Sequence, residues 1–143
     1  MIAYVHSSVL LRIVLGQPGA LTSWRAMQTP VSSRLVEVES LRALDRLRFR
    51  SAVGAEQIAL RREAVFRFLS AVEIVEVTYP ILARASQPLP TDLGTLDSIH
   101  LASALLWREM NEADLVMATH DQALGLAARA CGLRVIGLSE IGV

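Results

Sequence analysis

Three carboxylates lie at positions where they could take part in catalysis or bind a metal: Asp97, Asp121 and Glu37. Asp97 opens a largely apolar helical stretch, just after Thr95, in a first turn where the helix dipole favours a negative charge. Asp121 directly follows the apolar segment 115–119. Taken singly, each aspartate also has a structural explanation, as a helix-terminal charge for Asp97 and as a helix cap for Asp121.

Helical geometry distinguishes Glu37 from its neighbour Glu39. Glu37 lies in line with Leu41 and Leu44, on the side of the helix that is expected to pack. Glu39 lies on a charged face in line with Arg46, so we expect it to be a solvated partner of arginines. We therefore expect Glu37 to point toward the interior, where a carboxylate needs a cation or a hydrogen-bond partner.

The elements that would position these carboxylates alternate between strands and helices. Short β-prone segments predict strands at 2–5, 73–77, 115–119 and 133–138. Helices are predicted at 9–15, 20–27, 34–49, 55–70, 79–85, 95–110 and 122–131, with a break at Thr29-Pro30. This alternation predicts an α/β fold in which helices cover both faces of a parallel sheet. Functional residues of such sheets collect beyond the carboxyl ends of the strands, where Asp121 stands.

Composition excludes several classes of function. The chain has 143 residues, of which 52% are hydrophobic and 5% aromatic, so we expect one domain, 1–143, with an aliphatic core. Cys131 is the one cysteine, which excludes a disulfide framework or a multi-cysteine zinc site and suits a reducing cytoplasm. No apolar run approaches the roughly 18 residues of a membrane span. Arg12 interrupts the first apolar stretch, so we expect no signal peptide and no membrane partner.

The 14 basic residues are all arginines, and 14 acidic residues balance them. Without a lysine, the chain has no Schiff-base or P-loop lysine chemistry. Eight of the arginines fall between Arg34 and Arg67. They indicate either a genome that favours arginine codons or a phosphate-binding face, because the guanidinium fork matches phosphate.

Five segments, taken in sequence order, resemble the PIN domain and in particular the VapC-type toxins of bacterial toxin–antitoxin pairs. The segment 96–104, LDSIHLASA, is the most specific, and the others gain their weight from order and spacing. These others are YVHSSVLL at 4–11, SRLVEV at 33–38, ATHDQAL at 118–124 and AARACGLRV at 127–135. The resemblance covers nearly the whole chain and implies a three-layer PIN-like domain with a central parallel sheet flanked by helices.

The resemblance also implies a metal-dependent endoribonuclease. Carried over by position, Glu37, Asp97 and Asp121 are the catalytic and metal-binding acids, and Ser8 and Thr119 support the site. Clustered carboxylates repel one another unless a divalent cation lies among them, and hard oxygen ligands select Mg²⁺ or Mn²⁺. The implied partners are an RNA substrate, a small cognate antitoxin (VapB-like) and a second copy of the chain in a homodimer.

His6 departs from the family pattern, which has an aspartate at the end of the first strand. Imidazole is a poor ligand for Mg²⁺ and a better one for zinc and other transition metals. We therefore expect His6, if it is a metal ligand, to weaken Mg²⁺ binding and reduce cleavage. Three explanations stay open: an introduced or escape mutation that tames a toxic protein, a naturally degenerate nuclease, or a site for a different metal.

Two further interpretations compete with an active nuclease. In the first, the chain is a catalytically disabled protein that acts chiefly as an antitoxin-binding module. In the second, the pair His120-Asp121 marks an HD-type phosphohydrolase, but those proteins are all-helical and need further histidines at matching spacing. His100 lies one turn after Asp97 on the same helix, so it either faces the site or fills a pocket.

Overall fold

The computed structural model describes residues 1–21, 26–51 and 53–139. Five strands and six helices occupy this part of the chain. The strands are β1 (Ile2–Val5), β2 (Thr29–Ser33), β3 (Glu73–Val75), β4 (Leu115–Ala118) and β5 (Arg134–Ile136). The helices are α1 (Ser7–Val14), α2 (Leu35–Arg50), α3 (Ala55–Ala71), α4 (Tyr79–Ala85), α5 (Thr95–Asn111) and α6 (Gln122–Ala130).

All five strands are parallel and lie in the order β3-β2-β1-β4-β5. The first strand is therefore central, with Tyr4 opposite Val31 of β2 on one side and opposite Met117 of β4 on the other. The chain builds outward from β1 to β3 and then crosses back to add β4 and β5. The strand order thus reverses between β1 and β4, and crevices form at such a point, outside the carboxyl ends of the strands.

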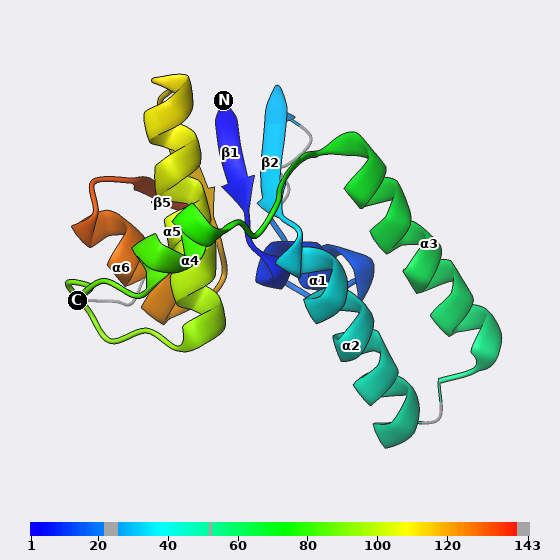
Figure 1. Cartoon of the computed structure of the whole chain (residues 1–143). Helices are drawn as coiled ribbons and strands as arrows, with labels where there is room; N and C mark the ends of the chain where they lie inside the picture. Colours follow the sequence, from blue (N-terminus) through cyan, green and yellow to red (C-terminus); the bar gives the residue numbers. More distant parts are fainter. Residues whose placement is uncertain (22–25, 52, 140–143) are drawn as a thin grey trace.

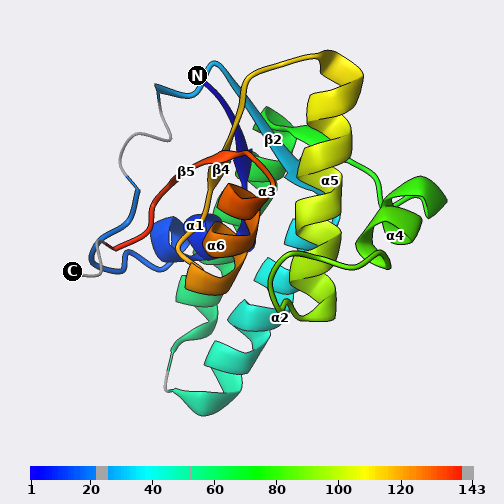
Figure 2. The ribbon, with the colours of Figure 1, turned by 90° about the vertical axis from the view of Figure 1, so that its left-hand side faces the viewer.

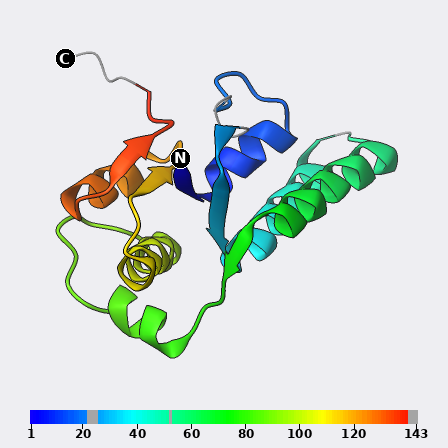
Figure 3. The same cartoon turned by 90° about the horizontal axis from the view of Figure 1, so that it is seen from above.

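The sheet divides the core into two layers, as the alternation of side chains along β1 shows. Tyr4 packs into a cluster that includes Leu101 of α5 and Leu124 of α6. Ala3 and Val5 face the other way, into a cluster supplied by α1, α2 and α3. Figure 3 shows these two groups of helices on opposite sides of the sheet, and Figure 2 shows α6 on one face with α4 outside α5. The three-layer α/β architecture expected from the sequence is confirmed.

The second strand corrects the sequence prediction, which placed a break at Thr29-Pro30. Pro30 has no N–H to donate and is normally excluded from a central strand. Here β3 pairs only with residues 31–33 of β2, so that Pro30 has a neighbouring strand only on its β1 side. The sheet therefore tolerates the proline because its outer neighbour starts one residue later.

Apart from the helix predicted at 20–27, the remaining predicted elements correspond to observed ones within a few residues. The predicted helix 20–27 includes 22–25 and Trp24, which lie outside the described residues. The α2–α3 pair extends away from the sheet (Figure 1) and leaves Phe49 and Phe66 exposed. Among the helices in the described part of the chain, none combines the length and apolarity needed to cross a membrane.

Candidate functional site

The carboxyl ends of β1 and β4 meet the first turns of three helices. His6 follows β1, caps α1 and donates its backbone N–H to the Ala118 carbonyl, at 3.0 Å. Asp97 lies in the first turn of α5, and Asp121 caps α6 directly after β4. Three helix N-termini therefore lie around one crevice, an arrangement that favours negative charge.

His6 is buried, with 5% of its surface exposed, and contacts both sides of the crevice. Its Nε2 lies 3.2 Å from Asp97 Oδ1. Its Nδ1 lies 2.8 Å from Ser8 Oγ and 3.1 Å from Thr119 Oγ1. The hydrogen bond from the ring lowers the pKa of Asp97, although partial burial opposes this effect. Asp97 is therefore held as a carboxylate beside the ring.

A second histidine extends the cluster behind His6. His100 is fully buried, and its Nε2 hydrogen-bonds with Oε1 of Glu39. Its Nδ1 lies 2.7 Å from the hydroxyl of Tyr4. Burial raises the pKa of Tyr4 far above its usual value, so the phenol keeps its proton. The two imidazole rings meet edge to face, with centroids 4.8 Å apart.

Glu39 occupies the interior position that the sequence analysis assigned to Glu37. Its Oε2 accepts a hydrogen bond from Ser7 Oγ at 3.4 Å, and its other oxygen contacts His100. Glu37 instead pairs with Arg34 at 3.3 Å on the surface, with 36% of its side chain exposed. The expectation that Glu37 points inward and Glu39 pairs with arginines is therefore wrong.

The physical reason lies in the neighbours of α2. Its buried residues are Val36, Ser40 and Leu44, and the two glutamates lie on opposite flanks of this stripe. The sequence pattern shows the stripe but does not show which flank meets α1 and α5. In the fold, the Glu39 flank meets Ser7 and His100, and the other flank faces Arg34 and solvent. The polar partners of Glu39 lie on other helices, so the sequence of α2 alone could not show which glutamate points inward.

Ser8, Thr119 and Asp121 link the ends of β1 and β4. Ser8 Oγ lies 3.3 Å from Thr119 Oγ1 and accepts the backbone N–H of His120 at 2.9 Å. Thr119 Oγ1 accepts the N–H of Asp121 at 3.0 Å. Asp121 Oδ1 accepts the Leu124 N–H at 2.9 Å and so caps α6. Among the described residues, Asp121 makes no hydrogen bond to His6, Asp97 or Glu39.

One donor atom each from His6, Glu39 and His100 lies within 4.8 Å of the other two, so this group could hold a metal ion. We call it the His–Glu–His cluster. Asp97 adjoins it through the 3.2 Å contact to His6. The donors are two imidazole nitrogens and carboxylate oxygens, a mixture that suits transition metals better than Mg²⁺. The cluster thus fits a divalent metal, but it differs from the all-carboxylate set expected from the resemblance.

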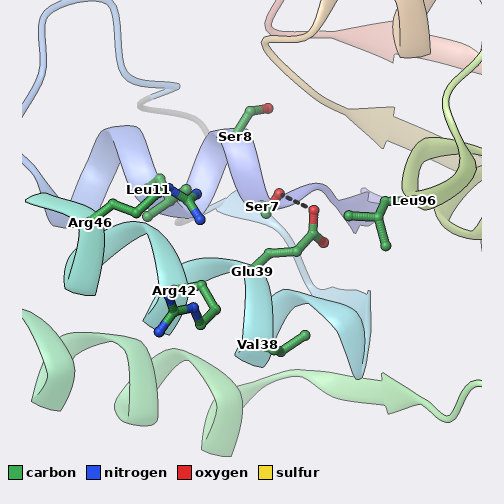
Figure 4. Close-up of a pocket in the computed structure, with 8 residues that line it drawn as sticks. All are labelled: Ser7, Ser8, Leu11, Val38, Glu39, Arg42, Arg46 and Leu96. Atoms are coloured by element: carbon green, nitrogen blue, oxygen red, sulfur yellow. Dashed lines mark hydrogen bonds between the residues drawn. The ribbon is translucent and has the colours of Figure 1, made fainter.

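A pocket of about 510 Å³ opens beside the cluster, between α1, α2 and the start of α5. Figure 4 shows Glu39 directed toward Ser7, with Arg42 and Arg46 following along the same helix. Arg42 pairs with Asp45 at 2.8 Å, whereas Arg46 makes no ion pair with any described residue. The pocket therefore joins a carboxylate of the cluster to two guanidinium groups. Its residues are Ser7, Ser8, Leu11, Val38, Glu39, Arg42, Arg46 and Leu96.

Known proteins resemble the chain in sequence and in fold. The family model described as PIN domain matches residues 3–129. Ribonuclease VapC46 of Mycobacterium tuberculosis is 30% identical over 140 residues, which cover 95% of this chain and 97% of that protein.

Two solved complexes share the fold at low sequence identity. A chain of FitAB bound to a DNA fragment matches with a TM-score of 0.70 and 15% identity, covering 95% of this chain and 94% of that one. A chain of VapBC2 from Rickettsia felis, bound to a DNA fragment from their promoter, matches with a TM-score of 0.65 and 12% identity, over 94% and 97% of the two chains. The likeness thus spans nearly the whole chain in both sequence and fold.

Proposed function

This chain belongs to the PIN domain family and is of the VapC ribonuclease type, and from this premise we propose that it cleaves RNA with a divalent metal held beside His6. The observation that carries the proposal is the convergence of Asp97, Glu39 and two histidines at the carboxyl ends of the central strands. The proposed biological role is the toxin of a type II toxin–antitoxin pair, acting in the cytoplasm as one PIN-like domain.

Asp97 and Glu39 are the acids that we assign to the metal, together with His6 and His100. A divalent metal at this place would supply an activated water and offset the charge of the scissile phosphate. Asp97 is kept ionised by its lowered pKa, and Ser7 orients Glu39. Ser8 and Thr119 hold the His6 ring. Asp121 is assigned a positioning role, because its carboxylate is used to cap α6.

The arginines of the pocket are the groups that we assign to the RNA backbone. Arg42 and Arg46 lie one turn apart on α2, on the same pocket as Glu39. Guanidinium groups bind phosphate in a bidentate manner, so these two would hold a strand across the cluster. Single-stranded or looped RNA fits such a site best, because its backbone can bend into a pocket.

His6 is expected to attenuate cleavage with Mg²⁺ or Mn²⁺. The imidazole replaces a hard oxygen ligand and removes a negative charge from the cluster. We expect His6→Asp to cleave RNA at least about 10-fold faster than the present chain when Mg²⁺ is supplied, since tuning a metal's ligands commonly changes activity by this amount or more. Cleavage should stop when a chelator is added.

The experiment compares RNA cleavage by this chain, by His6→Asp and by His6→Asp with Asp97→Ala, each with Mg²⁺ or Mn²⁺. The proposal expects strong cleavage from the single variant and none from the double variant. If His6→Asp leaves a varied set of RNAs intact, the nuclease proposal is wrong for this chain.

A second candidate function rests on the contact between His6 and Asp97. This contact gives Asp97 a partner without any metal, as expected of a disabled nuclease that acts chiefly as an antitoxin-binding module. The VapBC2 and FitAB complexes support a partner protein for this fold. Co-purification with a cognate VapB-like antitoxin, in the absence of cleavage by either the chain or His6→Asp, would favour this candidate. Light scattering would show whether the chain also forms the proposed homodimer.

A further inference from the structure

The His–Glu–His cluster differs chemically from a site built of carboxylates alone. Two of its three donors are imidazole rings, and both rings are at most 5% exposed. They come from elements 94 residues apart, the end of β1 and the first turns of α5, and the sheet brings them into edge-to-face contact. Glu39 adds a carboxylate from another helix, α2.

Both rings are oriented in the same way relative to their partners. In each, Nε2 contacts a carboxylate, which is Asp97 for His6 and Glu39 for His100. In each, Nδ1 contacts a hydroxyl group, from Ser8 and Thr119 for His6 and from Tyr4 for His100. Donor atoms of His6, His100 and Glu39 therefore lie within 4.8 Å of one another, and Asp97 adjoins this group through its contact with His6. The hydroxyls lie on the Nδ1 side of each ring.

This orientation matters because a hydroxyl can either donate or accept a hydrogen bond. Without a metal, Nε2 must carry the ring proton in order to donate to a carboxylate, and the hydroxyl donates to Nδ1. When a metal takes the Nε2 lone pair, the proton must lie on Nδ1, where the same hydroxyl can accept it. Metal-binding histidines commonly have such a partner on the other ring nitrogen. The surroundings of His100 thus accommodate the metal-binding tautomer without rearrangement. At His6, the backbone N–H of Ser8, which donates to Nδ1 at 3.4 Å, would have to give up that hydrogen bond.

We propose that the site binds a late first-row transition metal, Zn²⁺ or Co²⁺, through His6, His100 and Glu39, with Asp97 adjoining the site beside His6, in preference to Mg²⁺. This inference takes the location of the metal from the proposed function. What it adds is which metal binds there. Imidazole nitrogen suits Zn²⁺ and Co²⁺, whereas Mg²⁺ requires oxygen ligands in octahedral geometry.

The test measures metal binding directly on the full chain, with no RNA present. Calorimetric titration of metal-free protein with Zn²⁺ and with Mg²⁺ gives the two affinities, and the visible absorption of added Co²⁺ reports whether nitrogen ligands surround it. We expect one tight Zn²⁺ site per chain, no saturable Mg²⁺ binding in the same range, and the intense bands of four-coordinate Co²⁺. An affinity for Mg²⁺ equal to that for Zn²⁺ would overturn the proposal.

Four variants assign the ligands. His6→Asp and Glu39→Gln should each weaken Zn²⁺ binding by about 10- to 100-fold or more, and Tyr4→Phe by about 10-fold, the range found when ligand-supporting groups are removed. Glu37→Gln is the matched control for Glu39→Gln, because Glu37 lies on the same helix but pairs with Arg34 at the surface. It should leave Zn²⁺ affinity unchanged. Circular dichroism of each variant shows that a loss of binding is not a loss of folding.

The outcomes separate this proposal from the proposed function. If His6→Asp binds Zn²⁺ as tightly as the present chain, His6 is not a ligand and the proposal fails, whatever the chain does to RNA. If Zn²⁺ binding follows the four variants as stated but no metal supports RNA cleavage, the metal assignment stands and the nuclease proposal fails. A Co²⁺ spectrum of six-coordinate, all-oxygen type contradicts the assignment directly.

Discussion

His6 is held from both sides of its ring, which leaves the imidazole little freedom to turn. Asp97 contacts one nitrogen, and the hydroxyls of Ser8 and Thr119 contact the other. An aspartate at this position would be shorter and would lose the contacts behind the ring. His6→Asp would therefore affect the choice of metal in two ways: it replaces a nitrogen ligand with oxygen, and it shortens the side chain.

The two glutamates of α2 give a matched test at the residue scale. In the His6→Asp background, we expect Glu39→Gln to lower RNA cleavage by at least about 100-fold, since removing one group that stabilises transition-state charge commonly costs this much. Glu37→Gln should change cleavage less than about 3-fold, which is under 1 kcal/mol on the rate scale. Initial cleavage rates at a fixed Mg²⁺ concentration decide the matter. Equal losses in both variants would contradict the assignment of Glu39.

The lowered pKa of Asp97 links the site to acid stability. Because the folded-state value lies below the ordinary 3.8, the ionised carboxylate stabilises the fold above the ordinary value, and this contribution is lost as the pH falls through the folded value. Asp97→Asn should therefore lose less unfolding free energy between pH 6 and pH 3 than the parent chain. Urea unfolding at the two pH values measures the difference. Asp92→Asn, at an exposed position that forms no ion pair with the residues the structure describes, should behave as the parent chain does.

At the scale of elements, the loop after β5 supports the end of β4 through a glycine. Gly137 has a φ of 98°, and a Cβ at this position would lie 2.6 Å from the Thr119 carbonyl oxygen. The neighbouring His120 Nδ1 donates to the Gly137 carbonyl at 2.7 Å. The backbone of Thr119, directly after β4, thus approaches this loop too closely for a side chain at Gly137.

This close approach predicts different costs for two glycine substitutions. Gly16 also has a positive φ, of 63°, but a Cβ there meets nothing within 4 Å. We expect Gly16→Ala to cost about 1 kcal/mol of unfolding free energy, from backbone strain alone. Gly137→Ala should cost more, about 3 kcal/mol, because the contact with the Thr119 backbone adds to the strain. Denaturant unfolding of the two variants would contradict this account if their losses were equal.

Most elements could be predicted from the sequence because their signals are local. The apolar strand 115–118 and the helix that opens at Asp97 carry their own patterns of hydrophobicity and capping. β2 could not be predicted this way, because Pro30 indicates a break in the strand. The sheet tolerates Pro30 only because β3 pairs with residues 31–33 and leaves Pro30 without a neighbour on that side. Glu39 was missed for a similar reason: its partners, Ser7 and His100, lie on other helices. The local sequence shows which element a segment can form, but the elements packed against it determine which side of a helix faces the site.

At the scale of the whole molecule, the balanced charge means that the proposed RNA binding must depend on local groups. The net charge is zero, with 14 basic and 14 acidic residues, so no overall field attracts a polyanion. Arg42 and Arg46 nevertheless stand together on the pocket beside the cluster. The affinity for RNA should therefore depend on these two residues and be sensitive to salt.

The double variant Arg42→Ala and Arg46→Ala should weaken RNA binding and flatten its dependence on salt. Each phosphate contact on a single strand contributes about 0.7 to the slope of log affinity against log salt, so losing both arginines should lower the slope by about 1.4. Filter binding with the inactive Asp97→Asn background measures it. Arg134→Ala is the control, because Arg134 starts β5 at the opposite end of the sheet and pairs with Asp114. An unchanged slope in the double variant would place the RNA elsewhere.

The central position of β1 determines when, during synthesis, the residues of the cluster can come together. The first strand to leave the ribosome finds one of its two neighbours, β4, only after residue 115 has been made. His6 can likewise contact Asp97 and Thr119 only after these late parts of the chain have been made. Incomplete translation products therefore lack an assembled cluster, and the proposed nuclease site is not complete until synthesis is almost finished. If the chain is the proposed toxin, its cell has that interval in which to supply the proposed antitoxin.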